Sequence, residues 1–293
     1  MIIYHGSKDI IEKPEFGKGN QKNDYGLGFY CTESVELAKE WACSNNETNG
    51  YANQYEIDLS DYKVLDLREE KYSILNWMAL LLKFRTFDVN TPISAQAKEY
   101  ILENFYVDVE EYDVIIGYRA DDSYFSFAKD FINNTITVEQ LAKAMHLGEL
   151  GIQIVLKSKK AFDTVKYISY ELAECKEYYV KRVSRDKKAR ETYLSGYRQN
   201  LVSDGLFVMD IIRKGLKNGD KILWRQIFRQ CCYEYRHNVW IRGSLWLWAQ
   251  SILEYVCFFW GSKTNRKRQS EIFSWIFSNR FIRPRCKHNC VKR

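Results

Sequence analysis

The stretches Tyr4-His5-Gly6-Ser7 and Tyr25-Gly26-Leu27-Gly28-Phe29-Tyr30 decide how this sequence is interpreted. Ile2–Tyr4 is a short apolar run, which predicts a buried strand that ends at His5-Gly6. A polar loop with several glycines follows, and Phe29–Thr32 predicts a second strand. Thr32 is then expected to cap a helix whose apolar face carries Leu37, Ala38, Trp41 and Ala42.

The rest of the chain mixes short strands and helices without a regular βαβ order. Further strands are predicted at Gln54–Leu59, Val64–Leu67, Val114–Gly117 and Ile152–Lys157. Helices are predicted at Ser73–Phe87, from Pro92, within 118–134, from a Thr137–Gln140 capping box, at 174–198 and within Asp204–Lys214. This irregular mixture predicts an α+β fold.

Charge divides the chain into two segments. Residues 1–220 hold 29 Lys+Arg and 35 Asp+Glu, a net charge of −6. Residues 221–293 hold 15 Lys+Arg and three acids, a net charge of +12, together with six of the eight tryptophans. We therefore expect a globular domain over 1–220 and a basic Trp/Cys/Arg-rich extension over 221–293.

Several interpretations of the extension stay open. Residues 243–261 are apolar and flanked by basic residues, which is typical of a marginal membrane segment or an amphipathic surface helix. A basic, aromatic stretch could also bind nucleic acid. The abrupt change in composition equally fits a non-homologous extension, such as an out-of-frame read-through, without a selected function.

Other chemistries lack their motifs. No Gly-x-x-x-x-Gly-Lys-[Ser/Thr] loop is present, and Gly26-x-Gly28 lacks the third glycine of a dinucleotide fingerprint. Cys286-x-x-x-Cys290 has no second ligand pair at zinc-site spacing, so no metal is predicted. The chain opens without a secretory signal, and three scattered cysteines in 1–220 argue against a disulfide scaffold, so we expect a cytoplasmic protein.

His5-Gly6, then Gly26-x-Gly28-Phe29-Tyr30, then the strand at 152–157 resemble the NAD-binding core of the ADP-ribosyltransferases. The resemblance implies a split β-sheet core with flanking helices. It also implies that His5, with Gly6 and Ser7, binds the NAD ribose, that Gly28 and Tyr30 belong to the nicotinamide site, and that a glutamate on the later strand is catalytic. Trp41, eleven positions past Tyr30, could supply a second stacking ring.

A closer resemblance covers about the first three-quarters of the chain. Its motifs are His-Gly-Ser, Asp-Tyr-Gly-Leu-Gly-Phe-Tyr-x-Thr, Arg-Ala-Asp-Asp-Ser-Tyr-Phe and Leu-Gly-x-x-Gly, in that order. They look like a bacterial family of uncharacterised function that is grouped with the ADP-ribosyltransferases. Its genes are often found beside small antitoxin-like partners, so the resemblance implies a bacterial intracellular toxin or effector.

The sequence departs from the family pattern at the catalytic position. The strand offers Gln153 where the glutamate is expected, and Glu149 in the preceding turn is the nearest acid. Glutamine can bond a ribose hydroxyl but carries no negative charge, and that loss weakens the transition state by about 2–4 kcal/mol. The resemblance therefore places Gln153 at the catalytic position, with Glu149 as the alternative acid.

Each candidate also has a structural interpretation. His5 could be a buried structural histidine, Tyr30 and Trp41 could be core residues, and Gln153 could be an ordinary strand residue. Arg119 could contact a pyrophosphate or pair with Asp121 and Asp122. The sequence thus favours an NAD-dependent mono-ADP-ribosyltransferase with an unidentified acceptor, and the alternative is a non-catalytic nucleotide-binding or interaction module.

Overall fold

A computed structural model of the 293-residue chain describes residues 1–120, 122–145, 151–199 and 205–223. The chain divides into two compact units, Met1–Cys232 and Tyr233–Arg293, and all described residues belong to the first. Glu149 and residues 243–261 lie outside the described residues.

A three-stranded antiparallel sheet is built from β1 (Ile2–Ser7), β3 (Gly50–Glu56) and β7 (Lys166–Ala173), with β3 in the centre. The prediction that the first strand stops at His5-Gly6 was wrong, because β1 stays paired with β3 through Ser7. The bounds of the strand predicted at 54–59 were also wrong. β3 runs from Gly50 to Glu56, because its pairing with β1 and β7 begins at Tyr51 and Gly50.

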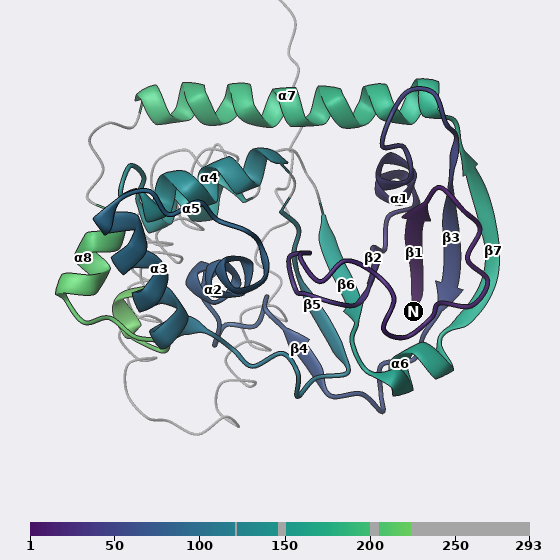
Figure 1. Cartoon of the computed structure of the whole chain (residues 1–293), viewed down its shortest axis with the longest axis horizontal. Helices are drawn as coiled ribbons and strands as arrows, with labels where there is room; N and C mark the ends of the chain where they lie inside the picture. Colours follow the sequence, from purple (N-terminus) through teal and green to yellow (C-terminus); the bar gives the residue numbers. More distant parts are fainter. Residues whose placement is uncertain (121, 146–150, 200–204, 224–293) are drawn as a thin grey trace, which may run out of the picture. The chain divides into compact units, whose positions relative to one another are not determined.

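A four-stranded sheet has the order β2 (Phe29–Cys31), β6 (Ile152–Leu156), β5 (Val114–Tyr118) and β4 (Val64–Asp66). β6 pairs antiparallel with both β2 and β5, and β4 runs parallel to β5. All four strands were predicted to within about a residue at each end. The two sheets lie side by side, with β1 next to β2 (Figure 1).

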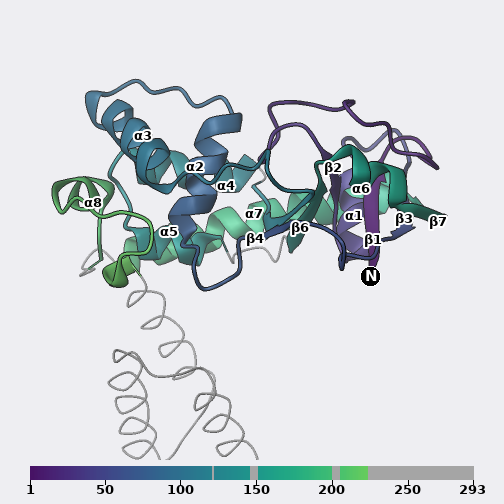
Figure 2. The ribbon, with the colours of Figure 1, turned by 90° about the horizontal axis from the view of Figure 1, so that it is seen from below.

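Helices cover one face of the four-stranded sheet. They are α2 (Ile74–Phe84), α3 (Pro92–Phe105), α4 (Asp122–Ile132), α5 (Val138–Ala144) and α8 (Val208–Arg213). Figure 2 shows these helices at one end of the unit and the three-stranded sheet with α1 at the other. The predicted capping box is confirmed: the Thr137 hydroxyl accepts from Gln140 N, and the Gln140 side chain accepts from Thr137 N.

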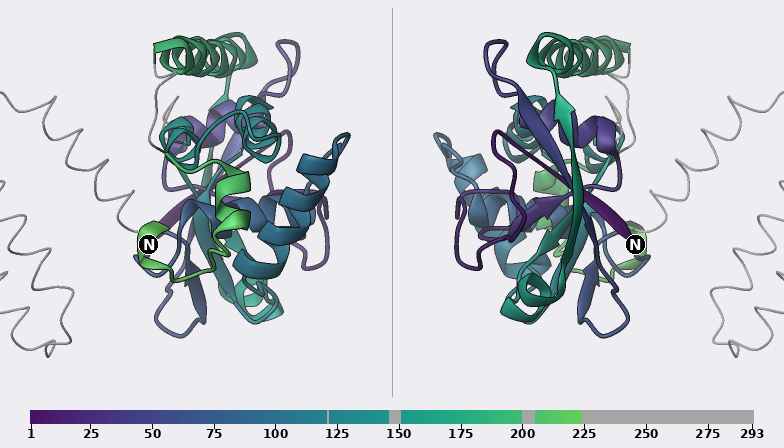
Figure 3. Two further views of the ribbon diagram at one scale, coloured as in Figure 1. Left: turned by 90° about the vertical axis from the view of Figure 1, so that its left-hand side faces the viewer. Right: turned by 90° about the vertical axis from the view of Figure 1, so that its right-hand side faces the viewer.

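Helix α1 (Val35–Ala42) packs on the three-stranded sheet, and the long helix α7 (Cys175–Gln199) crosses over it. Both end-on views in Figure 3 show α7 along the same edge of the unit. Ser34 caps α1 by accepting from Leu37 N, so the prediction of Thr32 as the cap was wrong. The short helix α6 (Lys159–Thr164) and β7 were not predicted; β7 exposes the apolar residues of one face.

The four-stranded sheet separates two buried clusters. Val155 packs with the helices, whereas Ile154 and Leu156 pack with Ile3 and Phe29 on the opposite face. This alternation confirms that Gln153 and Val155 share a face of β6. The fold is therefore mixed α/β with two sheets and flanking helices. Among the described residues, no helix has the length and apolar character needed to span a membrane.

Candidate functional site

The two sheets are joined by one residue pair between β1 and β2. Tyr4 N donates to Thr32 O at 2.7 Å, and Thr32 N donates to Tyr4 O at 2.9 Å. Beyond this pair no further backbone bond between β1 and β2 occurs in the described part of the chain. We call the place where β1 and β2 lose their backbone pairing the gap; the motifs Tyr4–Ser7 and Gly28–Tyr30 lie on its two sides.

His5 spans the gap with its side chain. Its Nδ1 lies 2.7 Å from the carbonyl oxygen of Tyr30, and its ring stacks on Phe29 with centroids 4.2 Å apart. Burial lowers the pKa of His5 from its ordinary value of 6.5, so the neutral ring is favoured. A neutral ring that donates from Nδ1 presents Nε2 as an acceptor, which suits a ligand hydroxyl.

Gly6 offers its main chain to the same gap. The Tyr4 main chain faces β2, and strand alternation directs the N–H and C=O of Gly6 the same way. Neither group has a hydrogen-bond partner among the described residues. A Cβ on Gly6 would lie 2.0 Å from Ala38 O, so only glycine permits α1 to pack this closely.

Tyr30 is fixed by its hydroxyl. It donates to Gly26 O at 2.6 Å and accepts from Tyr25 N at 3.1 Å, and desolvation raises its pKa. Its ring packs against the helical cluster on the Val155 face of the sheet. Gly28 allows β2 to approach β6, because a Cβ there would lie 2.6 Å from the Val155 side chain. Tyr30 therefore presents a ring rather than a titrating hydroxyl.

A set of contacts that the sequence did not reveal holds the turn before Tyr30. The buried Asp24 pairs with Arg85 at 3.0 Å and accepts from Ala120 N at 2.8 Å. The Tyr25 hydroxyl donates to Tyr118 O at 2.6 Å. Lys157 donates to the carbonyls of Tyr25 and Leu27. These residues come from separate motifs, so only the folded chain shows that they act together.

Gln153 is buried in β6, one position beyond the Cys31–Ile154 pair and separated from β1 by β2. It pairs with Gly117 in β5 and is 6% exposed. Its Oε1 is buried and has no hydrogen-bond donor among the described residues. An orphan buried acceptor costs about 1–3 kcal/mol, so a ligand hydroxyl or amide that donates to it would be favoured.

Trp41 has a different neighbour from the one predicted. It is half-buried outside the described core clusters, and the Arg119 guanidinium carbon lies 4.3 Å from its ring centroid. Its Nε1 is buried and finds no acceptor in the described residues. Arg119 thus covers one face of the Trp41 ring, and a nicotinamide stacked on Trp41 as predicted would have to use the other face.

The predicted residues reach the gap from two faces. Tyr30 and Gln153 lie on the Val155 face, whereas His5 stacks on Phe29 on the other face. Since β2 separates β1 from β6, the backbones of His5 and Ile154 are about 10 Å apart at ordinary strand spacing. The fold therefore brings the three strands together, and His5 contributes from the opposite side.

Ser7 is used locally. Its hydroxyl donates to Asp9 O and accepts from Asn53 Nδ2, which holds the start of the loop after β1. Glu149, the alternative acid, belongs to the residues that the structure leaves undescribed. No group of three His, Cys, Asp or Glu side chains suited to a metal ion occurs in the described ranges, and Cys286 and Cys290 lie outside them.

The geometry defines a mixed α/β protein whose two sheets are joined by one residue pair, beyond which β1 and β2 are not paired. The chain belongs to the DUF3990 family, described as a protein of unknown function, whose family model matches residues 1–167. Neither the curated proteins nor the solved structures contain a significant match to the chain. The matched residues include β1, β2, β6 and therefore every strand of the gap.

Proposed function

We propose that the gap between β1 and β2 binds NAD and that the protein is an NAD-dependent mono-ADP-ribosyltransferase. The observation that carries the proposal is the parting of the sheets at Gly6, which leaves one N–H and one C=O of the main chain without partners beside Tyr30. A primary amide carries the complementary acceptor and donor. Nicotinamide has such an amide on an aromatic ring.

The other residues suit the remaining parts of NAD. The Tyr30 ring offers a stacking surface, and its hydroxyl is fully engaged by the turn. Gln153 Oε1 is an acceptor for a ribose hydroxyl, and His5 Nε2 is an acceptor for a ligand hydroxyl on the other face of β2. The joining of a three-stranded and a four-stranded sheet by one residue pair also supports the split-sheet core that the sequence resemblance implies.

Chemistry at the nicotinamide bond is a glycosidic substitution. The bond from the ribose C1′ to the ring nitrogen breaks, nicotinamide leaves, and an acceptor attacks the oxocarbenium-like centre. In this proposal Gln153 holds a ribose hydroxyl, Tyr30 and Gly6 hold the departing nicotinamide, and His5 contacts the ligand from the other face of β2. The acceptor and a small antitoxin-like partner remain predictions from the resemblance.

Gln153 favours a second candidate from another class. A neutral amide at this position fits a module that binds NAD without turning it over, because no carboxylate there stabilises the positive charge. Both candidates require the same bound ligand. They differ in whether nicotinamide is released.

The experiment incubates the full chain with nicotinamide-labelled NAD and, separately, with adenylate-labelled NAD and lysate. Wild type, His5→Ala and Gln153→Glu are compared, with Lys166→Ala on the exposed part of β7 as the control. Nicotinamide release and labelled acceptor that disappear in His5→Ala but persist in Lys166→Ala support the transferase. Saturable binding without release in every variant supports the binding module, and no binding to wild type refutes both.

A further inference from the structure

The last strand of the three-stranded sheet, β7, has a neighbouring strand on one side. The sheet order is β1-β3-β7, and β7 pairs antiparallel with β3 from Lys166 to Ala173. In the right-hand view of Figure 3, β7 runs along the side of the unit that faces the viewer. No second strand of the described residues pairs with its outer edge. Such an edge presents unpaired N–H and C=O groups with which another strand can pair.

The alternation of the ladder shows which main-chain groups of β7 point outward. The main chain of Tyr4 is bonded to β2, so the next residue, His5, exchanges its main-chain bonds with Asn53 in β3. Asn53 therefore has no main-chain group left for β7, and Tyr170, which lies opposite it, turns its own N–H and C=O away from the sheet. The same alternation turns Leu172 outward. Apart from the ladder with β3, no main-chain hydrogen bond to either residue occurs in the described part of the chain.

A row of large apolar side chains lies beside these outward groups. The row consists of Ile168, Tyr170 and Leu172, which are each about half exposed. The Tyr170 ring contacts the Tyr51 ring of β3 edge-on, with centroids 5.5 Å apart. Glu171 points to the opposite face, where its carboxylate pairs with Lys39 of α1 at 2.8 Å. The face turned away from α1 therefore combines open main-chain groups with apolar side chains, which is the surface that an added strand requires.

The two ends of β7 carry opposite charges. Lys166 begins the strand and Glu174 directly follows it, and both side chains are exposed. Neither side chain forms an ion pair with another of the described residues. Two copies of the strand that run antiparallel bring the basic start of each next to the acidic end of the other. In charge, β7 is thus complementary to a second, antiparallel copy of itself.

The outward groups limit the register of such a pair. A hydrogen-bonded pair can join Tyr170 to Tyr170, Tyr170 to Leu172, or Leu172 to Leu172 of the two copies. The second register puts Glu171 opposite Glu171, and like charges directly opposite each other are destabilising. The third register centres the pair at the end of the strand, where the chain enters α7. The first register, centred on Tyr170, places Leu172 opposite Ile168 and each Glu171 opposite a neutral residue.

We propose that β7 pairs antiparallel with β7 of a second copy about a twofold axis at Tyr170, so that the protein forms a symmetric dimer with one continuous sheet. Each contact then occurs twice, and the half-exposed apolar row of each copy is covered by that of the other. Because a single strand pair is a small interface, the dimer dissociates on dilution. The proposal is independent of NAD, since β3 and β1 separate this edge from the gap.

The experiment measures the mass of the full chain by sedimentation velocity over a wide range of concentrations. Leu172→Lys places a charge in the apolar row, and Tyr170→Pro removes an outward N–H that the ladder with β3 does not use. Ile93→Lys on α3, another half-exposed apolar residue, is the matched control. Each change on β7 occurs twice in the dimer, so we expect each to weaken dimerisation by about tenfold or more. The control should dimerise as wild type does.

Charge reversal tests the direction of pairing. Lys166→Glu and Glu174→Lys should each weaken the dimer, and the double variant should restore it, because the two opposite charges are exchanged rather than lost. A wild-type chain that stays monomeric at every concentration, or a dimer that neither Leu172→Lys nor Tyr170→Pro weakens, would overturn the proposal. A double variant as weak as the single ones would exclude the antiparallel arrangement. Melting curves identify unfolded variants, and Leu172→Lys, which keeps the main chain intact, provides the test if Tyr170→Pro does not fold.

Discussion

His5 Nδ1 is 2.7 Å from the carbonyl oxygen of Tyr30, so a side chain makes the link that a backbone amide would make in a continuous sheet. The strands of these residues share one backbone pair, Tyr4 with Thr32, and then separate. His5 thus lets the sheet open at Gly6 without leaving the Tyr30 carbonyl unpaired.

The His5 ring should stay neutral at pH values below 6.5, at which an exposed histidine protonates. Burial lowers its pKa from 6.5, and protonation costs more in the folded than in the unfolded state. The stability contribution is present above pH 6.5 and is lost as the pH falls through the lowered pKa. Nitrogen-detected NMR titration should show protonated Nδ1 and unprotonated Nε2 at neutral pH.

His5→Asn is the control for that titration, because its amide can donate to the Tyr30 carbonyl from the Nδ1 position but cannot titrate. It should retain most of the stability at pH 7, whereas His5→Ala should lose about 1 kcal/mol. A His5 pKa at or above 6.5, or equal stabilities for the two variants, would contradict the assigned contact.

Tyr30→Phe should destabilise the turn before β2. The substitution removes the bond to Gly26 O and leaves Tyr25 N without its acceptor, which costs about 1–2 kcal/mol in urea unfolding. The aromatic ring remains, so NAD affinity should fall only a few-fold. Tyr30→Leu, which removes the ring, should abolish binding measured by calorimetry; equal affinities for the two variants would show that the ring does not stack on the ligand.

Gly6→Ala should be among the most damaging small substitutions in β1. The added Cβ would meet Ala38 O at 2.0 Å, and pushing α1 away costs about 2–3 kcal/mol or more. Gly17→Ala is the comparison. The φ of Gly17, 83°, is strained for alanine, but no other atom lies within 4 Å of the added Cβ, so we expect this substitution to lower the free energy of unfolding by about 1 kcal/mol. In thermal unfolding, Gly6→Ala should lower the melting temperature more than Gly17→Ala does. The reverse result would show that α1 is not packed on Gly6.

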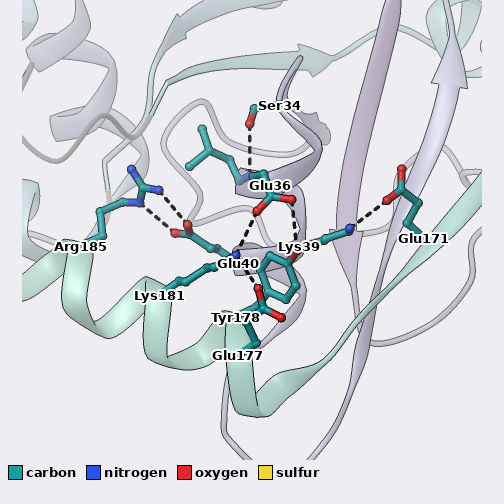
Figure 4. A network of polar contacts seen from close by, with 10 residues as sticks. Ser34, Glu36, Lys39, Glu40, Glu171, Glu177, Tyr178, Lys181 and Arg185 are labelled. Atoms are coloured by element: carbon teal, nitrogen blue, oxygen red, sulfur yellow. Dashed lines mark hydrogen bonds and ion pairs between the residues drawn. The ribbon is translucent and has the colours of Figure 1, made fainter.

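The packing of helix α7 on α1 should depend on the ion pair between Arg185 and Glu40 (Figure 4). Arg185 donates to both carboxylate oxygens of Glu40 at 2.9 and 2.8 Å, and the Glu40 side chain is 4% exposed. Glu40→Gln should cost about 2–3 kcal/mol, because a partly buried guanidinium loses its counter-charge. Glu191→Gln, which breaks the exposed pair with Lys187, should cost less than about 0.5 kcal/mol in the same unfolding experiment.

Local signals in the sequence predicted much of the fold. Apolar runs such as Val114–Tyr118 mark central strands that are buried on both faces, and the Thr137 capping box marks a helix start. The ends of β1 and β3 were missed because pairing between distant strands sets them. β7 was not predicted, although Ile168, Tyr170 and Leu172 alternate with polar residues; in the fold these three side chains are each about half exposed, at 47–49%.

The candidate site was predicted only in part. His5, Gly6, Tyr30 and Gln153 follow from motifs, but no sequence pattern shows that His5 and Tyr30 approach from opposite faces of the sheet. The support by Asp24, Arg85 and Lys157 depends on contacts between segments far apart in the chain. Arg119 was noticed for its charge, whereas its stacking on Trp41 required the packing of α1 against the end of β5.

The most direct test of the NAD site follows the His5 ring during a titration of the full chain with NAD. The His5 signals are assigned by their loss in His5→Asn, and the Nε2 shift is recorded at a pH where the ring is neutral. We predict a saturable change at Nε2, with the Nδ1 bond to Tyr30 O kept, and the same dissociation constant by calorimetry. An Nε2 signal that does not move at saturating NAD, or no saturation at all, would contradict the assignment of this gap as the NAD site.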